Sequence, residues 1–351
     1  MIRWLALLLV FPVMTGCDSI AYYAQAVQGQ AAILLGREPI QRLVADPLLE
    51  PRLREQLLLV ESARDFAEAE LGLDAAGSFT TYVDPGRQHI VWNVFAAPWN
   101  SVDLISWCFP IAGCVAYRGY FSEQAATQYA RRLAAQGYDV FVGGVDAYST
   151  LGWFKDPLPA TVLRRSDSQL AGLVFHELSH QRIYVPGDTR FNESFATFVE
   201  QQGLRLWLHQ QGRPEQFAGV TSALDAQQGF ADFVIAYREQ FRQLYAMGGD
   251  NAAELAEQKQ QLFEQMRSDW QQRPDADGYR GWFAGELNNA RLATVGAYFD
   301  WVPAFEQIYA DCDNSLEDFY LAVERLAKLP AAQRTTEIER LQALRLQITR
   351  H

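Results

Sequence analysis

The sequence predicts an α+β fold with a small sheet and a mostly helical C-terminal half. Between residues 20 and 73, apolar residues recur every three or four positions, as in LREQLLLVESARDFAEAELGL, which is typical of amphipathic helices. Residues 79 to 121 are richer in aromatic and β-branched side chains separated by Gly and Pro, which favours strands. From Ser166 onward nearly every segment has helical periodicity. Strands followed by a run of helices indicate the α+β class.

Breaks in these patterns set the expected element boundaries. Pro39, Pro47 and Pro51 divide the first helical region into pieces. Ser122 is a suitable N-cap for a helix over SEQAATQYARRLAAQ, and Gly137 ends that helix. The stretch YDVFVGGVDAYSTLGWF then has the composition of a strand, which completes the expected sheet region before the helical half.

Size and charge limit the function classes. The chain has 351 residues, 49% of them hydrophobic, which is enough for a large core. We expect a single domain over residues 17–351, with helices and the small sheet in 20–165 and the helical part with the candidate site in 166–351. The net charge of −12, without a stripe of Lys and Arg to offset it, argues against a nucleic-acid partner.

The N-terminus has the pattern of an export signal. MIRWLALLLVFPVMTGC contains one basic residue, an apolar run from Trp4 to Val13 and small residues up to Cys17. The ending MTGC resembles the lipobox of bacterial lipoproteins. That resemblance implies cleavage after Gly16, a lipid on Cys17, and a location on the periplasmic side of a bacterial membrane, inner or outer. The alternative is a plain secretory signal with an incidental cysteine.

Cysteine placement fits an exported protein. Cys108 and Cys114 lie close together in CFPIAGC, and an oxidising compartment would permit a local disulfide between them. Two free thiols are the alternative, because sequence alone does not give the geometry. Cys312 is left over and is expected to be buried.

The segment VFHELSHQRIYVPGDTRFNESFATFVE carries the chemistry. Residues Ser166 to Ser168 offer an N-cap before QLAGLVFHELSHQ, so His176 and His180 should share one helix. Four residues correspond to 400° of rotation, which leaves the two imidazoles within about 40° of each other and able to bind one metal ion. Glu177, beside the first histidine, can act as general base toward a water activated by that ion. The competing interpretation is a helix with ordinary core or surface histidines.

A catalytic zinc site usually has a third protein ligand. One more helical turn fits after His180 before VPGD reverses the chain, and Asp188 or Thr189 can cap a second helix over TRFNESFATFVEQQG. The chain would thus continue one turn beyond His180, reverse, and run back along the first helix, which brings Glu193 level with the histidines. Glu200 faces the same way but lies roughly 10 Å further along that helix, which makes it an alternative ligand, a partner that orients a histidine, or a solvated side chain.

HELSH followed by NESFA resembles the gluzincin peptidases, whose third ligand lies in an Asn-Glu motif on the next helix. DPLPATVLRRSDSQLAGLVFHELSHQ, GDTRFNESFATFVE and LNNARLATVGAYFDWVPAFEQ further resemble a bacterial family of predicted zinc aminopeptidases, many with lipoprotein signals. The resemblance covers most of the predicted mature chain. It implies a zincin-like core, one Zn²⁺ on His176, His180 and Glu193, Glu177 as base, and peptides as substrates.

The chain departs from the well-known members in two respects. Twelve residues separate His180 from Glu193, fewer than in the best-known gluzincins, whereas the nineteen before Glu200 are closer to their spacing. The Gly-x-Met-Glu-Asn element that binds a substrate's free amine in well-known zinc aminopeptidases does not occur. As stabiliser of the oxyanion we expect Tyr298 in VGAYFDW, with an aromatic residue buried in a helix as the alternative.

These observations predict a lipid-anchored, zinc-dependent peptidase, with aminopeptidase activity implied by the resemblance. The alternative is an envelope lipoprotein that contains zinc and binds peptides or partner proteins without catalysis. Such a protein would hold its metal in a closed, four-ligand site.

Overall fold

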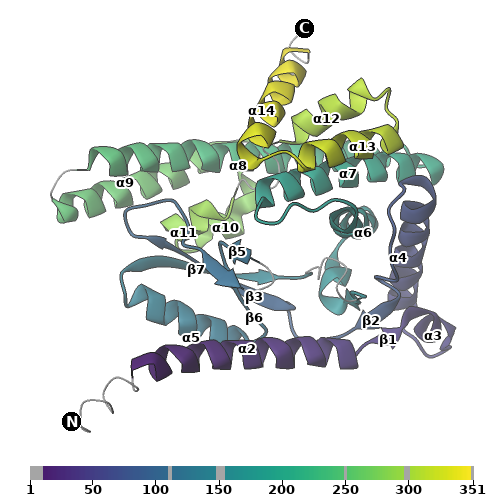
Figure 1. Cartoon of the computed structure of the whole chain (residues 1–351), viewed down its shortest axis with the longest axis horizontal. Coiled ribbons are helices and arrows are strands. Elements are labelled where there is room, and N and C mark those ends of the chain that lie inside the picture. The colour runs from purple at the N-terminus through teal and green to yellow at the C-terminus, as the bar shows by residue number, and fades with distance from the viewer. Residues whose placement is uncertain (1–10, 110–112, 148–154, 249–250, 296–300, 349–351) are drawn as a thin grey trace.

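The computed structural model describes residues 11–109, 113–147, 155–248, 251–295 and 301–348 (Figure 1). It confirms the α+β class: three small sheets lie among many helices, and the C-terminal half is almost entirely helical. The expected order of elements, helices first, then strands, then helices, is also the observed one.

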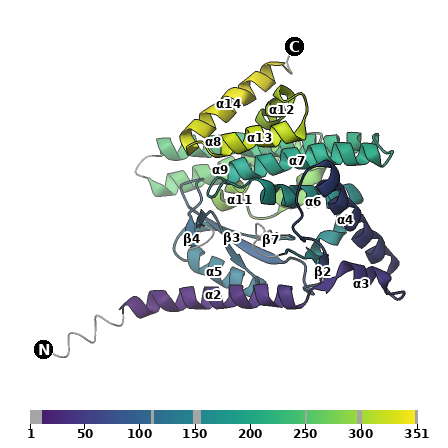
Figure 2. The same ribbon diagram turned by 45° about the vertical axis from the view of Figure 1, so that its right-hand side comes forward.

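Three helices form the N-terminal region: α2 (Phe11–Leu35), α3 (Ile40–Ala45) and α4 (Pro51–Glu70). Prolines separate them as expected, and Pro51 is the first residue of α4, where it loses no intrahelical hydrogen bond. Glu50 caps α4 by accepting a hydrogen bond from the backbone N–H of Leu53 at 2.7 Å. In Figures 1 and 2 α2 runs along the lower rim of the molecule. None of the helices in the described ranges is both long and apolar enough to cross a bilayer.

The largest sheet has the order β6-β3-β7, with β3 (Val91–Pro98) between β6 (Arg118–Tyr120) and β7 (Tyr138–Val145). Both pairings are antiparallel. Helix α5 (Glu123–Ala134) packs on this sheet, and Ser122 caps it as expected. The predicted strand after Gly137 ends at Val145, and most of its expected remainder lies outside the described residues.

The other strands of the described residues form two smaller sheets. β2 (Thr81–Val83) pairs antiparallel with β1 (Glu38–Pro39) and parallel with β8 (Leu158–Pro159). β4 (Trp107–Phe109) and β5 (Gly113–Val115) form a hairpin in which Cys108 faces Cys114, and a disulfide joins the two. Cys312, expected to be buried, is half-buried with a free thiol. The sequence did not predict β1 and β8, because two-residue strands have no detectable alternation.

The helical half begins after the 3₁₀ turn η1 (Ala160–Arg164). Its long members are α6 (Asp167–Arg182), α7 (Thr189–Gln210), α8 (Gln216–Met247) and α9 (Ala252–Gln271). Shorter elements follow: η2 (Ala276–Tyr279), α10 (Arg280–Ala284), α11 (Asn289–Ala293), α12 (Val302–Asp311) and α13 (Leu316–Ala327). A last long helix, α14, covers Ala331–Ile348.

The main hydrophobic core surrounds the pair α6 and α7. Phe175 of α6 and Phe191, Phe195 and Phe198 of α7 are fully buried in it, together with residues of α4, α12 and α13. Burying large aromatic side chains from both helices is the main favourable term that holds the pair together. A separate aromatic cluster packs α8, α9 and α10. The core therefore fixes α6 between α4 and α7.

A buried ion pair fixes the start of α7. Asp188 caps this helix by accepting a hydrogen bond from the backbone N–H of Phe191 at 3.1 Å. Arg334 of α14 donates to the same carboxylate from Nη2 at 2.7 Å and to the carbonyl of Leu329 at 2.8 Å. Its guanidinium is buried, so these contacts are shielded from water.

Replacing Arg334 with methionine should therefore lower the free energy of unfolding by about 3 kcal/mol, because Asp188 would keep its charge without a partner. Urea denaturation measures the change. The matched control is Arg340→Met, which removes the exposed pair with Glu337 and should leave the urea midpoint unchanged. Equal midpoints for the two variants would show that the Arg334 pair does not stabilise the fold.

Candidate metal centre

Helix α6 presents both histidines of the HELSH motif. A capping box starts the helix: the Ser166 hydroxyl accepts from the backbone N–H of Gln169, and the Gln169 side chain accepts from the N–H of Ser166 at 3.0 Å. The expected cap is thus the observed one. His176 and His180 follow on one face, with ring centroids 5.0 Å apart. The two imidazoles can therefore act together on one ion.

The turn between α6 and α7 sets the level at which Glu193 returns. Gly187 has a φ of +81°, a left-handed conformation that glycine adopts without strain, and Asp188 caps α7 as expected. Asn192 then bonds to Val185 twice: its Oδ1 accepts from the backbone N–H and its Nδ2 donates to the carbonyl, both at 2.8 Å. These two bonds tie the first turn of α7 to the chain leaving α6. Sequence reasoning did not assign this role to the asparagine before Glu193.

Three side chains of this hairpin meet at one point. Nε2 of His176 lies 3.3 Å from Oε2 of Glu193, and Nε2 of His180 lies 3.8 Å from the same oxygen. One ligand atom from each residue lies within 4.8 Å of the other two. A tetrahedral metal with bonds of about 2.0–2.2 Å keeps its ligands about 3.3–3.6 Å apart. The donor set and spacing fit a metal ion held by three residues, with a fourth position left over.

Glu200 contacts the opposite side of the His176 ring. Its Oε2 lies 3.2 Å from Nδ1, the nitrogen that does not face Glu193. A carboxylate in this position can accept a hydrogen bond from Nδ1–H and thereby favour the tautomer whose unprotonated Nε2 faces a metal. This geometry favours Glu193 over Glu200 as the third ligand and places Glu200 where it could orient the His176 ring.

Glycine permits the close approach of the two helices at this point. A Cβ atom on Gly172 would lie 2.8 Å from Oε1 of Glu200 and 3.0 Å from Cδ1 of Leu204, and one on Gly203 would lie 2.8 Å from Phe175. Real side chains do not come this close. A larger residue at position 172 would displace the carboxylate of Glu200 from its place beside His176, and one at position 203 would force the ring of Phe175 to move.

Burial and neighbouring charges shift the pKa values at the site. Burial raises the pKa of Glu177 to about 7, and burial together with the charge of His176 lowers the pKa of His180 to about 4. Burial alone would lower the pKa of His176, but its hydrogen bonds to Glu193 and Glu200 outweigh that effect and raise it to about 10. Without a metal, Glu177, Glu193 and Glu200 thus stabilise the protonated, positively charged form of His176. A bound metal ion would replace the proton on this imidazole.

Two phenols, Tyr117 and Tyr184, lie near Glu193. The sequence suggested Tyr117 only as a contact to a substrate carboxylate, with packing in a strand as the alternative, and did not suggest Tyr184. The pKa values of Tyr117 and Tyr184 are raised, chiefly by burial of the hydroxyls and in addition by the negative charge of Glu193. The Tyr184 ring stands edge-on to that of His180, with centroids 6.4 Å apart. Both side chains remain partly exposed. Tyr184 lies two residues beyond the end of α6, where the backbone is already extended, so helical spacing gave no signal for it.

Comparison with protein families places the chain in one family. A family model described as "Putative aminopeptidase" matches residues 21–338. The chain belongs to this family. The matched range includes both helices of the site, α6 and α7. No curated protein and no solved structure matched the chain.

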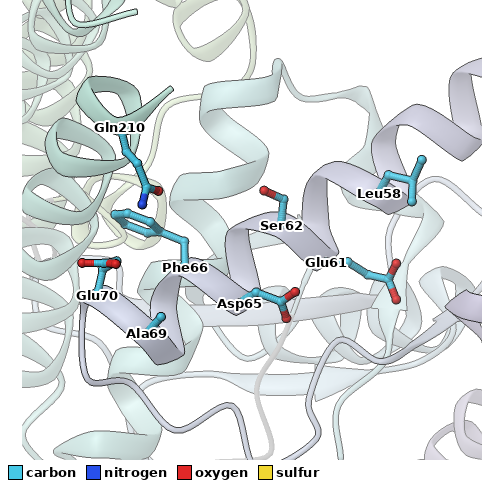
Figure 3. A pocket seen from close by; sticks show the side chains of 8 residues that line it. All are labelled: Leu58, Glu61, Ser62, Asp65, Phe66, Ala69, Glu70 and Gln210. Carbon is cyan, nitrogen blue, oxygen red and sulfur yellow. The ribbon is translucent and has the colours of Figure 1, made fainter. Parts of the chain in front are cut away.

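A hollow on the surface lies apart from the three ligand candidates. An acidic hollow over α4 and the end of α7 is lined by Glu61, Asp65, Glu70 and Gln210, and it shares no residue with the metal centre (Figure 3). Tyr298, the expected oxyanion stabiliser, lies outside the described residues. The candidate donors within the described ranges are therefore Tyr117 and Tyr184.

The metal affinity of variants should distinguish the roles of Glu193 and Glu200. Glu193→Gln should weaken metal binding by more than about a hundredfold because it removes a ligand, whereas Glu200→Gln should weaken it by about ten- to a hundredfold through loss of ring orientation. Competition with a chromogenic chelator measures both, and Glu61→Gln, in the acidic hollow, is the matched control without effect. A larger loss for Glu200→Gln than for Glu193→Gln would reverse the two roles.

Proposed function

We propose that this member of the aminopeptidase family is a zinc-dependent peptidase of the gluzincin type that removes N-terminal residues from peptides. The observation that carries the proposal is the convergence of the Nε2 atoms of His176 and His180 on one oxygen of Glu193. Two imidazoles and one carboxylate are the ligand set of catalytic zinc peptidases, which keep one position open for water. The family assignment supports the choice of peptides as substrates.

Glu177 is proposed as the general base. It follows His176 directly on α6, and its burial raises its pKa to about 7, close to the pH at which a carboxylate can both take up and release a proton. Zinc, when bound, lowers the pKa of water and polarises the peptide carbonyl. Glu177 then accepts the proton of the attacking water and passes it to the amine of the leaving group. Glu200 holds the His176 ring in position throughout.

Tyr184 and Tyr117 are proposed as hydrogen-bond donors to the substrate carbonyl, in addition to the expected Tyr298. Their raised pKa values keep both hydroxyls protonated at neutral pH, so each can donate to an oxygen that gains negative charge. They come from different parts of the chain, Tyr184 from the connection between α6 and α7 and Tyr117 from the connection between β5 and β6. Tyr117 would therefore approach from outside the hairpin that carries the three ligand candidates.

The N-terminal pattern supports a location on the periplasmic side of a bacterial membrane, with cleavage after Gly16 and a lipid on Cys17. An exported chain would also meet the oxidising conditions under which the Cys108–Cys114 disulfide persists.

Peptide cleavage read by mass spectrometry tests the proposed reaction. The zinc-loaded protein should release single N-terminal residues from a mixed peptide library, and Glu177→Gln should slow this by about 10²–10⁴-fold while the zinc content stays unchanged. Glu61→Gln is the control with full activity. Internal cuts would make the protein an endopeptidase. Bound zinc without turnover by the wild type would instead favour a zinc-containing lipoprotein that binds peptides.

Removing one hydroxyl tests the phenols. Tyr184→Phe or Tyr117→Phe should lower kcat by roughly 10²-fold or more with little change in zinc affinity, because the lost hydrogen bond forms fully only in the transition state. Tyr23→Phe removes an equally exposed hydroxyl on α2 and should have no effect. If both site variants keep the wild-type kcat, neither phenol stabilises the oxyanion.

A further inference from the structure

Helix α2 has an unusual outer face. Four large apolar side chains project from it into solvent: Ile20 is 69% exposed, Tyr23 43%, Val27 69% and Leu35 85%. Their spacing of three, four and eight residues places them on one side of the helix. Exposed apolar residues that occur singly are ordinary, but a row of them along one helix marks an interaction surface.

The same helix contains no charged residue between Ser19 and Gly36. At the chain's overall 21% of charged residues, a stretch of this length would carry about four. Water-exposed helix surfaces normally carry charged residues, so their absence here needs a cause. The outer face of α2 is therefore suited to an apolar environment in an otherwise acidic protein.

The inner face of α2 is fixed to the rest of the protein. Tyr22 packs edge-on against Tyr120 of β6 with centroids 5.5 Å apart, and Gln25 accepts a hydrogen bond from the backbone N–H of Phe121 at 3.1 Å. Gly29 lies against the ring of Phe121, and Ile33 is buried. The helix cannot rotate to hide its apolar row without breaking these contacts. In both views it forms the lower rim, with no other element beneath it (Figures 1 and 2).

The position of α2 in the chain indicates what covers this face. The apolar run Trp4–Val13 and Cys17 directly precede the row that begins at Ile20. An apolar leader or a lipid on Cys17 would bring this end of the helix to a membrane, and the uncharged side chains would then meet the bilayer first. A tyrosine beside aliphatic residues also suits the boundary between headgroups and acyl chains.

We propose that α2 lies flat on the bilayer and buries its outer row, Ile20, Tyr23, Val27 and Leu35, among the lipids, as a second attachment besides the N-terminal anchor. A single anchor leaves a protein free to tilt, whereas a helix held along its length fixes its orientation. The proposal does not rest on the peptidase activity, and its test uses no catalytic readout.

Fluorescent labels on single introduced cysteines test the orientation. The full chain is expressed in a bacterium, so that its N-terminus is processed as in the cell, with Cys312→Ser to remove the free thiol. Ile20→Cys and Leu35→Cys each carry the label, and the protein is reconstituted into phosphatidylcholine vesicles with spin-labelled acyl chains. The two positions are about 22 Å apart along the helix. If the helix lies flat, the label at each of the two positions should lose about half of its fluorescence.

Leu321→Cys is the matched control, because this leucine is 44% exposed on α13, on the other side of the molecule, and should not be quenched. Quenching at position 20 but not at 35 would mean that the chain is tethered by its N-terminus alone, and would overturn the proposal. The proposal would also be overturned if neither label were quenched and the Val27→Cys variant formed crosslinked dimers. A second copy of the chain would then cover this face of α2. As a further check, Val27→Asp should reduce the quenching at position 35 by exposing a charge to lipid.

Discussion

The close packing of α6 against α7 is the constraint on which the candidate site depends. At Gly172 and Gly203 a Cβ atom would meet side chains of the facing helix, and phenylalanines from both helices are buried in the core. Such close packing resists displacement of either helix. The carboxylates of α7 therefore reach the imidazoles of α6 at distances suited to a metal, without any long loop in between.

Electrostatics at the site follow from this packing. Burying His176, Glu177 and His180 on one helix against Glu193 and Glu200 on the next places five ionisable groups in a space largely closed to water. Burial makes each isolated charge costly, and the pairing of His176 with two carboxylates offsets that cost. The result is a site that favours a cation and in which burial raises the pKa of the Glu177 carboxyl to about 7.

Periodicity and capping residues in the sequence predicted the α+β class, both helices of the site, their caps at Ser166 and Asp188, and the convergence of Glu193 on the histidines. Each of those features depends on residues close together in the chain, so short sequence patterns are enough to predict it. The roles of Asn192 and Arg334 were not predictable, because one depends on the exact path of a turn and the other joins residues 146 positions apart. Tyr117 was missed as a neighbour of Glu193 for the same reason: tertiary packing brings it there. The functions of Cys17 and Tyr298 stay predictions.

The hairpin from His176 to Glu200 contains all three candidate ligands within one short length of chain, whereas the ion pair of Arg334 and the phenol of Tyr117 reach the region from distant segments. Closing a short loop costs little entropy, and contacts between distant residues form later and are lost more readily. If the β5–β6 connection opened locally, the hairpin would still keep its three ligand candidates together through its own short turn. Bound metal would then report on an intact hairpin rather than on a protein folded throughout, and a preparation could be fully loaded with metal while part of its chains lacks the surroundings needed for catalysis.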